Sequence, residues 1–193
     1  MRPLPLRLLV CAALGLGLAL TLGAPRLGAD EIPEAKRARG RRETVLAGID
    51  IARLQKAPIA KIKKLYGAPD VVDKTPTPPG YSEIEYRWER PGRNKLAVRT
   101  RNEDGEPEHL VEIDVWGEKP TGRLGRTGQG LTLGSTLRSV ERIYGKRYEV
   151  LRPGDKGRRL ALWIAWDEDW SLNLDFDEHQ RINHIQVVKN EDD

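Results

Sequence analysis

The clearest hydrophobic pattern in the chain lies within Leu131–Gly145 and predicts one short helix. Its apolar residues recur at intervals of three and four, as one face of an α-helix requires; they are Leu137, Val140, Ile143 and Tyr144. Ser135 precedes them at a position suited to an N-cap. Gly145 follows where a helix C-terminus favours glycine. The pattern therefore predicts a helix bounded by these two residues.

A weaker copy of this pattern occurs earlier, at Ala57–Gly67, and also ends in Tyr-Gly. Each predicted helix is followed by three segments of alternating polarity, which is typical of half-buried β-strands. The expected strands are residues 83–89, 95–101 and 109–116 after the first helix, and 161–167, 171–177 and 182–188 after the second. Two sets of elements in the same order indicate an internal duplication.

The predicted fold class is α+β, with two tandem αβββ units whose antiparallel sheets carry the helices on one face. The expected boundaries are a signal peptide at 1–29, a disordered charged spacer at 30–44 and a first unit at 45–117. A glycine-rich linker at 118–130 then leads to the second unit, at 131–190. We expect each unit to leave the other face of its sheet uncovered.

Because strand side chains alternate between faces, their parity separates a core face from a helix-free face. The predicted core face comprises Ile84, Tyr86, Trp88, Leu96, Val98, Val111, Ile113, Val115, Leu162, Ile164, Trp166, Leu172, Leu174, Phe176, Ile185 and Val187. The helix-free face comprises Glu85, Arg87, Arg99, Glu112, Asp114, Trp116, Trp163, Ala165, Asn173, Asp175, His184 and Gln186. A binding function is expected on this second, polar face.

Two tryptophans stand out on the helix-free face, because aromatic side chains anchor many protein interfaces. The predicted binding residues are Trp116, Trp163, Asn173, Asp175, His184, Gln186, Arg87 and Arg99. Two alternatives stay open for Trp163: it anchors a partner, or a neighbouring part of the chain covers it.

Asp175, Asp177 and His184 share the same parity and suggest an alternative chemistry. Two carboxylates and an imidazole are able to hold a divalent ion or to serve as acid and base. The spacing matches no established ligand motif, so no metal or catalytic residue is assigned. No cofactor is expected either, because GRTGQG at 125–130 lacks the lysine and Ser/Thr of a phosphate-binding loop.

The N-terminus predicts export. Arg2 and Arg7 precede an apolar run at 8–22, and small residues then allow cleavage after Ala29. An uncleaved anchor is the alternative. Cleavage would remove three of the 33 basic residues and no acidic one, leaving 30 against 29 and a net charge of +1. The charge then gives no reason to expect nucleic acid as a partner, and no stable membrane span is expected after processing. The chain's one cysteine, Cys11, would leave with the leader.

The duplicated pattern resembles the β-lactamase-inhibitory-protein-like fold and the small outer-membrane assembly lipoproteins. The matching residues are Leu133, Gly134, Ser135, Val140, Tyr144 and Gly145, with partial matches at 59–67. The resemblance to the inhibitors implies a concave, aromatic sheet surface that holds another protein. The predicted mature chain lacks both the disulfides of the inhibitors and the lipid-bearing cysteine of the lipoproteins.

These observations predict an exported, non-enzymatic protein-binding module of the periplasm or cell exterior, with an envelope or extracellular protein as its partner. One alternative is a small-ligand or metal-binding domain, or a weak hydrolase, that uses Asp175 and His184. Another is a structural envelope protein tethered through the basic residues of 37–42.

Overall fold

A long antiparallel sheet dominates the computed structural model of the protein, which describes residues 38, 40–54, 58–89, 94–103, 107–117, 123–152, 154 and 159–189. The predicted signal peptide and most of the predicted spacer lie outside these residues. The elements are β1 (Val45–Leu46), β2 (Ile49–Asp50), α1 (Pro58–Tyr66), β3 (Val71–Thr75), β4 (Tyr81–Trp88), β5 (Lys95–Glu103), β6 (His109–Trp116), α2 (Leu137–Tyr144), β7 (Glu149–Arg152), β8 (Ala161–Ala165), β9 (Trp170–Phe176) and β10 (Ile182–Lys189).

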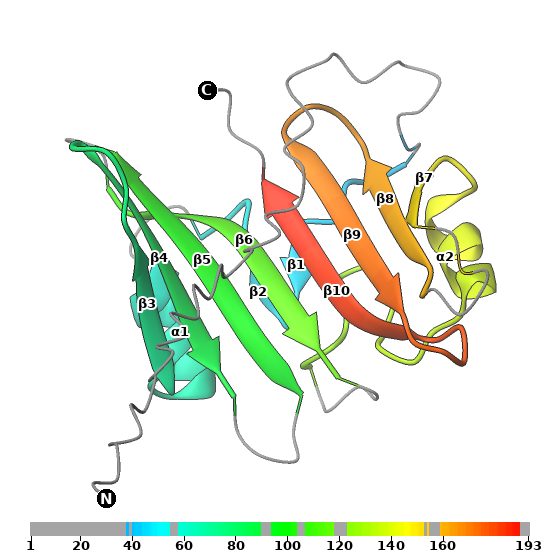
Figure 1. Cartoon of the computed structure of the whole chain (residues 1–193), viewed down its shortest axis with the longest axis horizontal. Helices are drawn as coiled ribbons and strands as arrows, with labels where there is room; N and C mark the ends of the chain where they lie inside the picture. The colour runs from blue at the N-terminus through cyan, green and yellow to red at the C-terminus, as the bar shows by residue number, and fades with distance from the viewer. Residues whose placement is uncertain are drawn as a thin grey trace, which may run out of the picture. The chain divides into compact units, whose positions relative to one another are not determined.

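The sheet has eight strands in the order β3-β4-β5-β6-β10-β9-β8-β7, and every neighbouring pair is antiparallel. The first four strands follow α1 and the last four follow α2 (Figure 1). The two sets join at the β6–β10 pair, where His184 lies opposite Trp116 and Val187 lies opposite Ile113. The chain therefore builds one continuous sheet instead of two separate ones.

The predicted α+β class of two αβββ units is wrong. The described structure is mostly β, with 13% helix and 49% strand, and its two short helices accompany a single eight-stranded sheet. The prediction missed β3 and β7, the outermost strands, and it left open whether the two units share one sheet or form separate domains. Strand parity does not reveal which strands pair, so the join between β6 and β10 left no signal in the local pattern.

The helices begin and end close to the predicted positions. Gly145 has a φ of 83°, a left-handed conformation that glycine adopts without a Cβ clash, and it follows α2 as expected. The N-cap prediction was wrong, because Thr136 occupies the N-cap of α2. Ser135 instead closes a local turn: its hydroxyl accepts a hydrogen bond from the backbone N–H of Thr132 at 3.2 Å.

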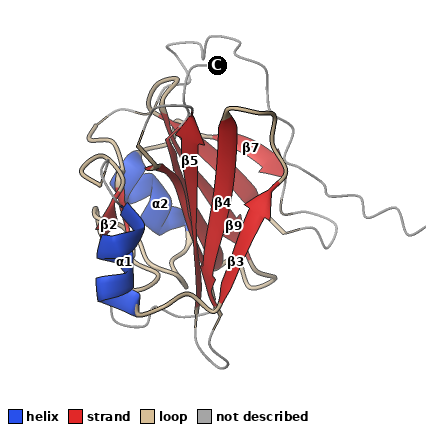
Figure 2. Cartoon of the chain, turned by 90° about the vertical axis from the view of Figure 1, so that its left-hand side faces the viewer, coloured by secondary structure: helices blue, strands red, loops and turns tan. Residues whose placement is uncertain are grey.

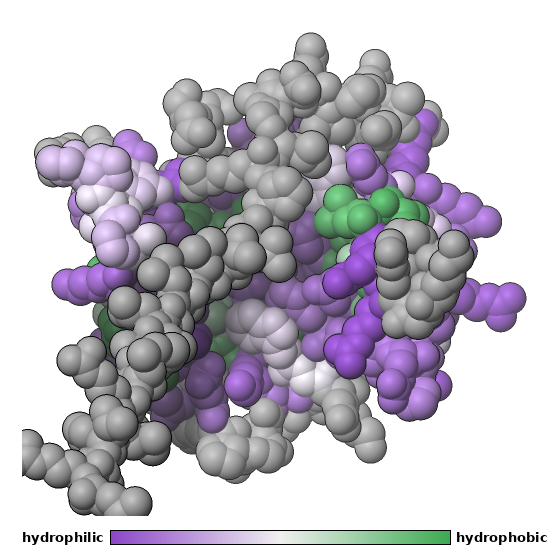
Figure 3. Space-filling model, in the orientation of Figure 1, coloured by the Kyte–Doolittle hydropathy of each residue, from purple (hydrophilic) through white to green (hydrophobic). Residues whose placement is uncertain are grey.

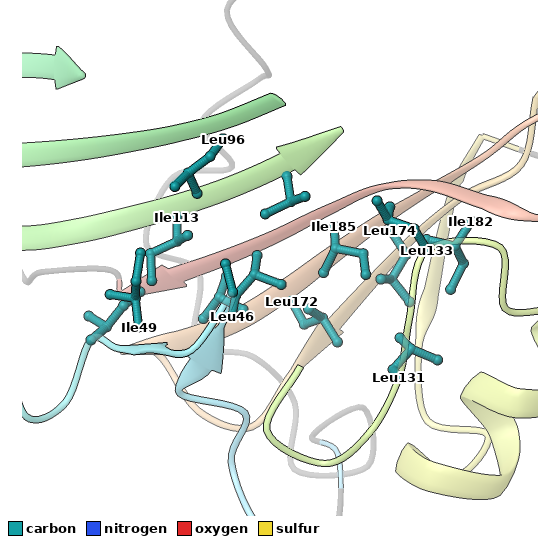
Figure 4. Packing of buried hydrophobic residues seen from close by; sticks show 14 of the residues in the cluster. Leu46, Ile49, Leu96, Ile113, Leu131, Leu133, Leu172, Leu174, Ile182 and Ile185 are labelled. Carbon is teal, nitrogen blue, oxygen red and sulfur yellow. The ribbon is translucent and has the colours of Figure 1, made fainter. Parts of the chain in front are cut away.

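The hydrophobic core lies on the side of the sheet where Figure 2 shows α1, α2 and β2. Leu96 and Ile113 from the first four strands and Leu172 and Ile185 from the last four are all buried there (Figure 4). The predicted core face is confirmed except at two positions, Ile84 and Val111, which lie outside the buried cluster. The two halves of the sheet thus share one core.

Val111 leaves the core because β6 contains a β-bulge. Arg99 pairs with Glu112 but Thr100 pairs with Leu110, so Val111 is the additional residue on its strand. Leu110, with 0% exposure, takes the place in the core that parity assigned to Val111.

Residues near the two predicted connectors also belong to the fold. Glu43, within the predicted spacer, is only 2% exposed. In the predicted linker, Thr127 bridges to Leu46, and the N–H of Gly128 donates to the carbonyl of Val45 at 2.9 Å. A Cβ on Gly128 would lie 2.9 Å from the Val45 Cβ, so this close approach requires glycine. The described part of the linker is therefore docked against β1.

Candidate functional site

The β6–β10 pair brings most of the predicted binding residues together on one face. Cross-strand partners share a face of the sheet, and two rows of partners run across its centre. One row joins Trp116, His184 and Asp175; the other joins Arg87, Ala97, Asp114, Gln186, Asn173 and Trp163. Arg99 lies in the next row, between Glu85 and Glu112. We call this surface the helix-free face.

His184 lies at the β6–β10 join, in the row at the end of β6, and is held by groups on three sides. Its Nε2 lies 3.0 Å from Asp114 Oδ1, and its Nδ1 lies 3.0 Å from Asp175 Oδ2. The indole of Trp116 stacks on the imidazole, with ring centroids 4.9 Å apart and an interplanar angle of 4°. Arg152 Nη2 donates to the second oxygen of Asp175 at 2.7 Å. These contacts fix the orientation of both aromatic rings.

These carboxylates also fix the charge of His184. Burial alone would lower its pKa, but the hydrogen bonds and charges of Asp114 and Asp175 raise the pKa to about 9. The hydrogen bond from His184 lowers the pKa of Asp175 in turn. Both groups are therefore charged at neutral pH, and the ring uses both N–H groups as donors.

The structure separates the three residues that suggested metal or acid–base chemistry. Asp175 and His184 are hydrogen-bonded to each other. Asp177 belongs to the turn after β9, where its Oδ1 accepts from the backbone N–H groups of His179 and Arg181. Among the described residues, no three His, Cys, Asp or Glu side chains assemble into a metal site.

Glu112 and Asp114 form a pair of carboxyl groups that the sequence placed on this face but did not mark as part of the site. They are 8% and 5% exposed, respectively. Burial, followed by the charge and hydrogen bond of Asp114, raises the pKa of Glu112 well above its usual value. Only the burial of these acids, which their sequence does not reveal, distinguishes them from solvated charges.

Arg87 and Arg99 belong to a network of ion pairs on β3 to β6. The Arg99 guanidinium contacts Glu83 at 3.1 Å, Glu85 at 3.3 Å and Glu112 at 3.0 Å. Arg87 forms ion pairs with Asp73, Glu85 and Glu89. Both arginines are thus engaged by the chain's own carboxylates, which makes them supports of the surface more than free contact groups.

The amide pair of Asn173 and Gln186 connects His184's surroundings to Trp163. Asn173 Nδ2 donates to Gln186 Oε1 at 2.5 Å, and Trp163 lies across the strand from Asn173. Trp163 is partly exposed and lies outside the buried core cluster. Figure 3 looks onto the helix-free face, where described hydrophilic side chains predominate and an apolar group appears over β7 and β8.

A second buried polar cluster was missed by the sequence reasoning, on the core side of the sheet. The Glu43 carboxylate accepts hydrogen bonds from the backbone N–H groups of Val45, Gly128 and Gln129 and from the Tyr144 hydroxyl, at 2.8 to 3.1 Å. These donors come from three separate segments of the chain, so we interpret Glu43 as a structural residue that holds the segments together. No motif marks Glu43, because its partners are distant in sequence.

Comparisons with known proteins add little to this geometry. No family model and no curated protein matches the chain. Among solved structures, it is similar to a DUF4309 family protein (YjgB) from Bacillus subtilis subsp. subtilis str. 168, at 14% identity. The match covers 74% of this chain and 83% of that chain with a TM-score of 0.39, which supports no argument about fold or function.

The structure describes part of the basic run at 37–42, which the sequence suggested as an envelope tether, and both helices that bear on the membrane-anchor alternative. Arg42 forms an ion pair with Asp167, and the carbonyl of Arg41 accepts from Gln129 Nε2 at 2.6 Å. The rest of the basic run, residues 37 and 39, lies outside the described residues. Neither described helix has the length and apolar character needed to cross a bilayer.

Proposed function

We propose that the protein is an exported, non-enzymatic module that binds another protein of the cell envelope or exterior on its helix-free face. The single observation that carries the proposal is the stacked pair of Trp116 and His184, fixed by Asp114 and Asp175 at the β6–β10 join, in the middle of the strand order of an eight-stranded sheet. Rigid aromatic side chains set among polar groups are typical of protein interfaces.

The residues around this pair are consistent with an interface surface. Trp163 adds a second, partly exposed aromatic group, separated from Trp116 by the strands β10 and β9. Paired charges of Arg87, Arg99 and their carboxylates lie on the β3–β6 side of this pair, and such paired charges give orientation and specificity more than affinity. The exported location rests on the signal peptide that the sequence predicts at 1–29.

Affinity capture with the mature chain, residues 30–193, tests the proposal against an envelope extract of the source cell. Trp163→Ala should reduce recovery of a specific partner by about thirtyfold or more, because truncating an interface anchor commonly costs ~2 kcal/mol. Leu65→Ala is the matched control, since Leu65 is 53% exposed on α1, on the opposite side of the sheet.

Comparing the two variants shows whether the partner binds the helix-free face or the opposite side of the sheet. Loss of one protein with Trp163→Ala and its retention with Leu65→Ala supports the proposal. Equal recovery by both variants, each confirmed as folded by circular dichroism, contradicts it.

A further inference from the structure

A hollow of about 230 Å³ opens on the opposite side of the sheet from the proposed binding surface. It lies over β4 and β5, on the face that also packs against α1. Its lining residues are Ser82, Ile84, Tyr86, Thr100, Asn102 and Glu108. Liquid water occupies about 30 Å³ per molecule, so the hollow has room for a small organic group.

Glu108 gives this hollow a fixed carboxylate. Its Oε1 accepts a hydrogen bond from the Thr100 hydroxyl at 2.7 Å and one from the Tyr86 hydroxyl at 3.1 Å. Thr100 is only 1% exposed, so its donor is held in place by the sheet. No described residue donates to the second oxygen, Oε2. One carboxylate oxygen is therefore anchored while the other remains able to accept a hydrogen bond from a ligand.

Tyr86 and Ile84 supply the rest of the chemistry. Burial and the nearby charge of Glu108 raise the pKa of Tyr86 to about 12, so its hydroxyl stays protonated as a donor. The Lys63 ammonium lies 6.0 Å from the centre of the Tyr86 ring, so this ring already has a cation of the chain beside it. Ile84 lies outside the buried core and adds an apolar wall.

From these features we propose that the hollow is a binding site for a primary ammonium group carried on a short alkyl chain. The ammonium donates to Glu108 Oε2, while the alkyl chain contacts Ile84. A lysine side chain of another protein and a free alkylamine share this chemistry. The site is independent of the helix-free face and does not rest on the function proposed there.

Nuclear magnetic resonance titration of the mature chain with n-butylammonium chloride, at constant ionic strength, tests this site. We expect a millimolar dissociation constant, with the largest shifts at the backbone amides of Ile84 and Thr100. n-Butanol, which has the same length without the charge, should bind about tenfold more weakly or worse.

The matched variants are Glu108→Gln and Glu178→Gln. Both remove one negative charge, but the Glu178 side chain is 77% exposed in the turn between β9 and β10. Glu108→Gln should weaken n-butylammonium binding about tenfold or more, and Glu178→Gln should leave it unchanged. Butanol and butylammonium binding equally to the wild type overturns the proposal even if Glu108→Gln fails to fold. Equal affinity of a folded Glu108→Gln variant and the wild type overturns it as well.

Two peptides distinguish the sources of the amine. A blocked Gly-Lys-Gly peptide that binds at least as tightly as n-butylammonium, while its norleucine counterpart does not bind, assigns the site to lysine side chains. Binding of n-butylammonium without binding of the lysine peptide assigns it to free amines. Binding of neither ligand overturns the proposal.

Discussion

His184 has two ring nitrogens, and each faces a carboxylate on a neighbouring strand. The histidine side chain is 17% exposed and that of Asp114 is 6% exposed, so solvent screens their interaction only in part. The charge on this ring therefore strengthens the side-chain contacts of β10 with β6 and with β9. At the residue scale, that proton contributes to the order of the helix-free face.

The stability of the protein should therefore fall at alkaline pH. The pKa of His184 rises from 6.5 to about 9 on folding, so its contribution is fully present below pH 6.5 and is lost as the pH approaches 9. The shift corresponds to about 3 kcal/mol of unfolding free energy. Urea unfolding between these pH values measures the loss. The raised pKa of Glu112 acts in the same direction.

His184→Gln is the control for this prediction, because glutamine does not titrate. Most of the decrease between pH 6.5 and 9 should disappear in the variant. The lowered pKa of Asp175 has the opposite sign: its contribution is present above pH 3.8 and is lost as the pH falls further. A His184 ring that titrates near 6.5 in the folded protein would contradict its stabilisation by Asp114 and Asp175.

At the scale of elements, Glu43 joins the segment just before β1 to α2 and to the loop that precedes α2. Tyr144→Phe removes one donor to this buried carboxylate and also the contact with Thr127, 3.0 Å from the Tyr144 hydroxyl. We expect the free energy of unfolding to fall by about 2 kcal/mol. Tyr148→Phe serves as the control, since its hydroxyl contacts only Glu141 among described residues, at 3.1 Å.

Urea denaturation at neutral pH provides the comparison between these tyrosines. Tyr148→Phe should cost clearly less than Tyr144→Phe, because the Tyr144 hydroxyl serves a buried acid and that of Tyr148 does not. Equal losses in the two variants would mean that Glu43 is not the structural residue described above.

Individual strands were more predictable than their arrangement. β6 was predicted at its observed bounds, 109–116, because its apolar and polar residues alternate over most of its length. β3 and β7 were missed because their side chains are largely exposed, as expected of edge strands with little apolar patterning. Short-range periodicity describes how a strand is buried but carries no information about its partner.

In the candidate site, too, the face of each residue was predictable from the sequence and the contacts between strands were not. Parity placed Trp116 and His184 on one face, but their stacking depends on the pairing of β6 with β10, which local sequence does not specify. The two carboxylates beside His184 come from different strands, one of them across that join. The contacts of His184 with these two carboxylates therefore require the register of the whole sheet, which local sequence does not give.

At the scale of the whole molecule, the shared sheet and core predict that the two halves do not fold separately. The full chain should unfold in one transition, with far-ultraviolet circular dichroism and tryptophan fluorescence giving coincident curves. The fragment 38–117 should be unfolded, because it loses β10 and the core side chains from the second half. A dispersed nuclear magnetic resonance spectrum of that fragment would contradict this prediction.

A partner that contacts both Trp116 on β6 and Trp163 on β8 would span the two halves of the sheet. Site-specific cross-linking in the source cell tests this central claim most directly, with p-benzoylphenylalanine in place of Trp163 in the full chain. The same photoreactive residue in place of Leu65, on the opposite side of the sheet, is the control. We predict a defined cross-link to one protein from position 163 and its absence from position 65. No cross-link from position 163, or the same product from both positions, would contradict binding through the helix-free face.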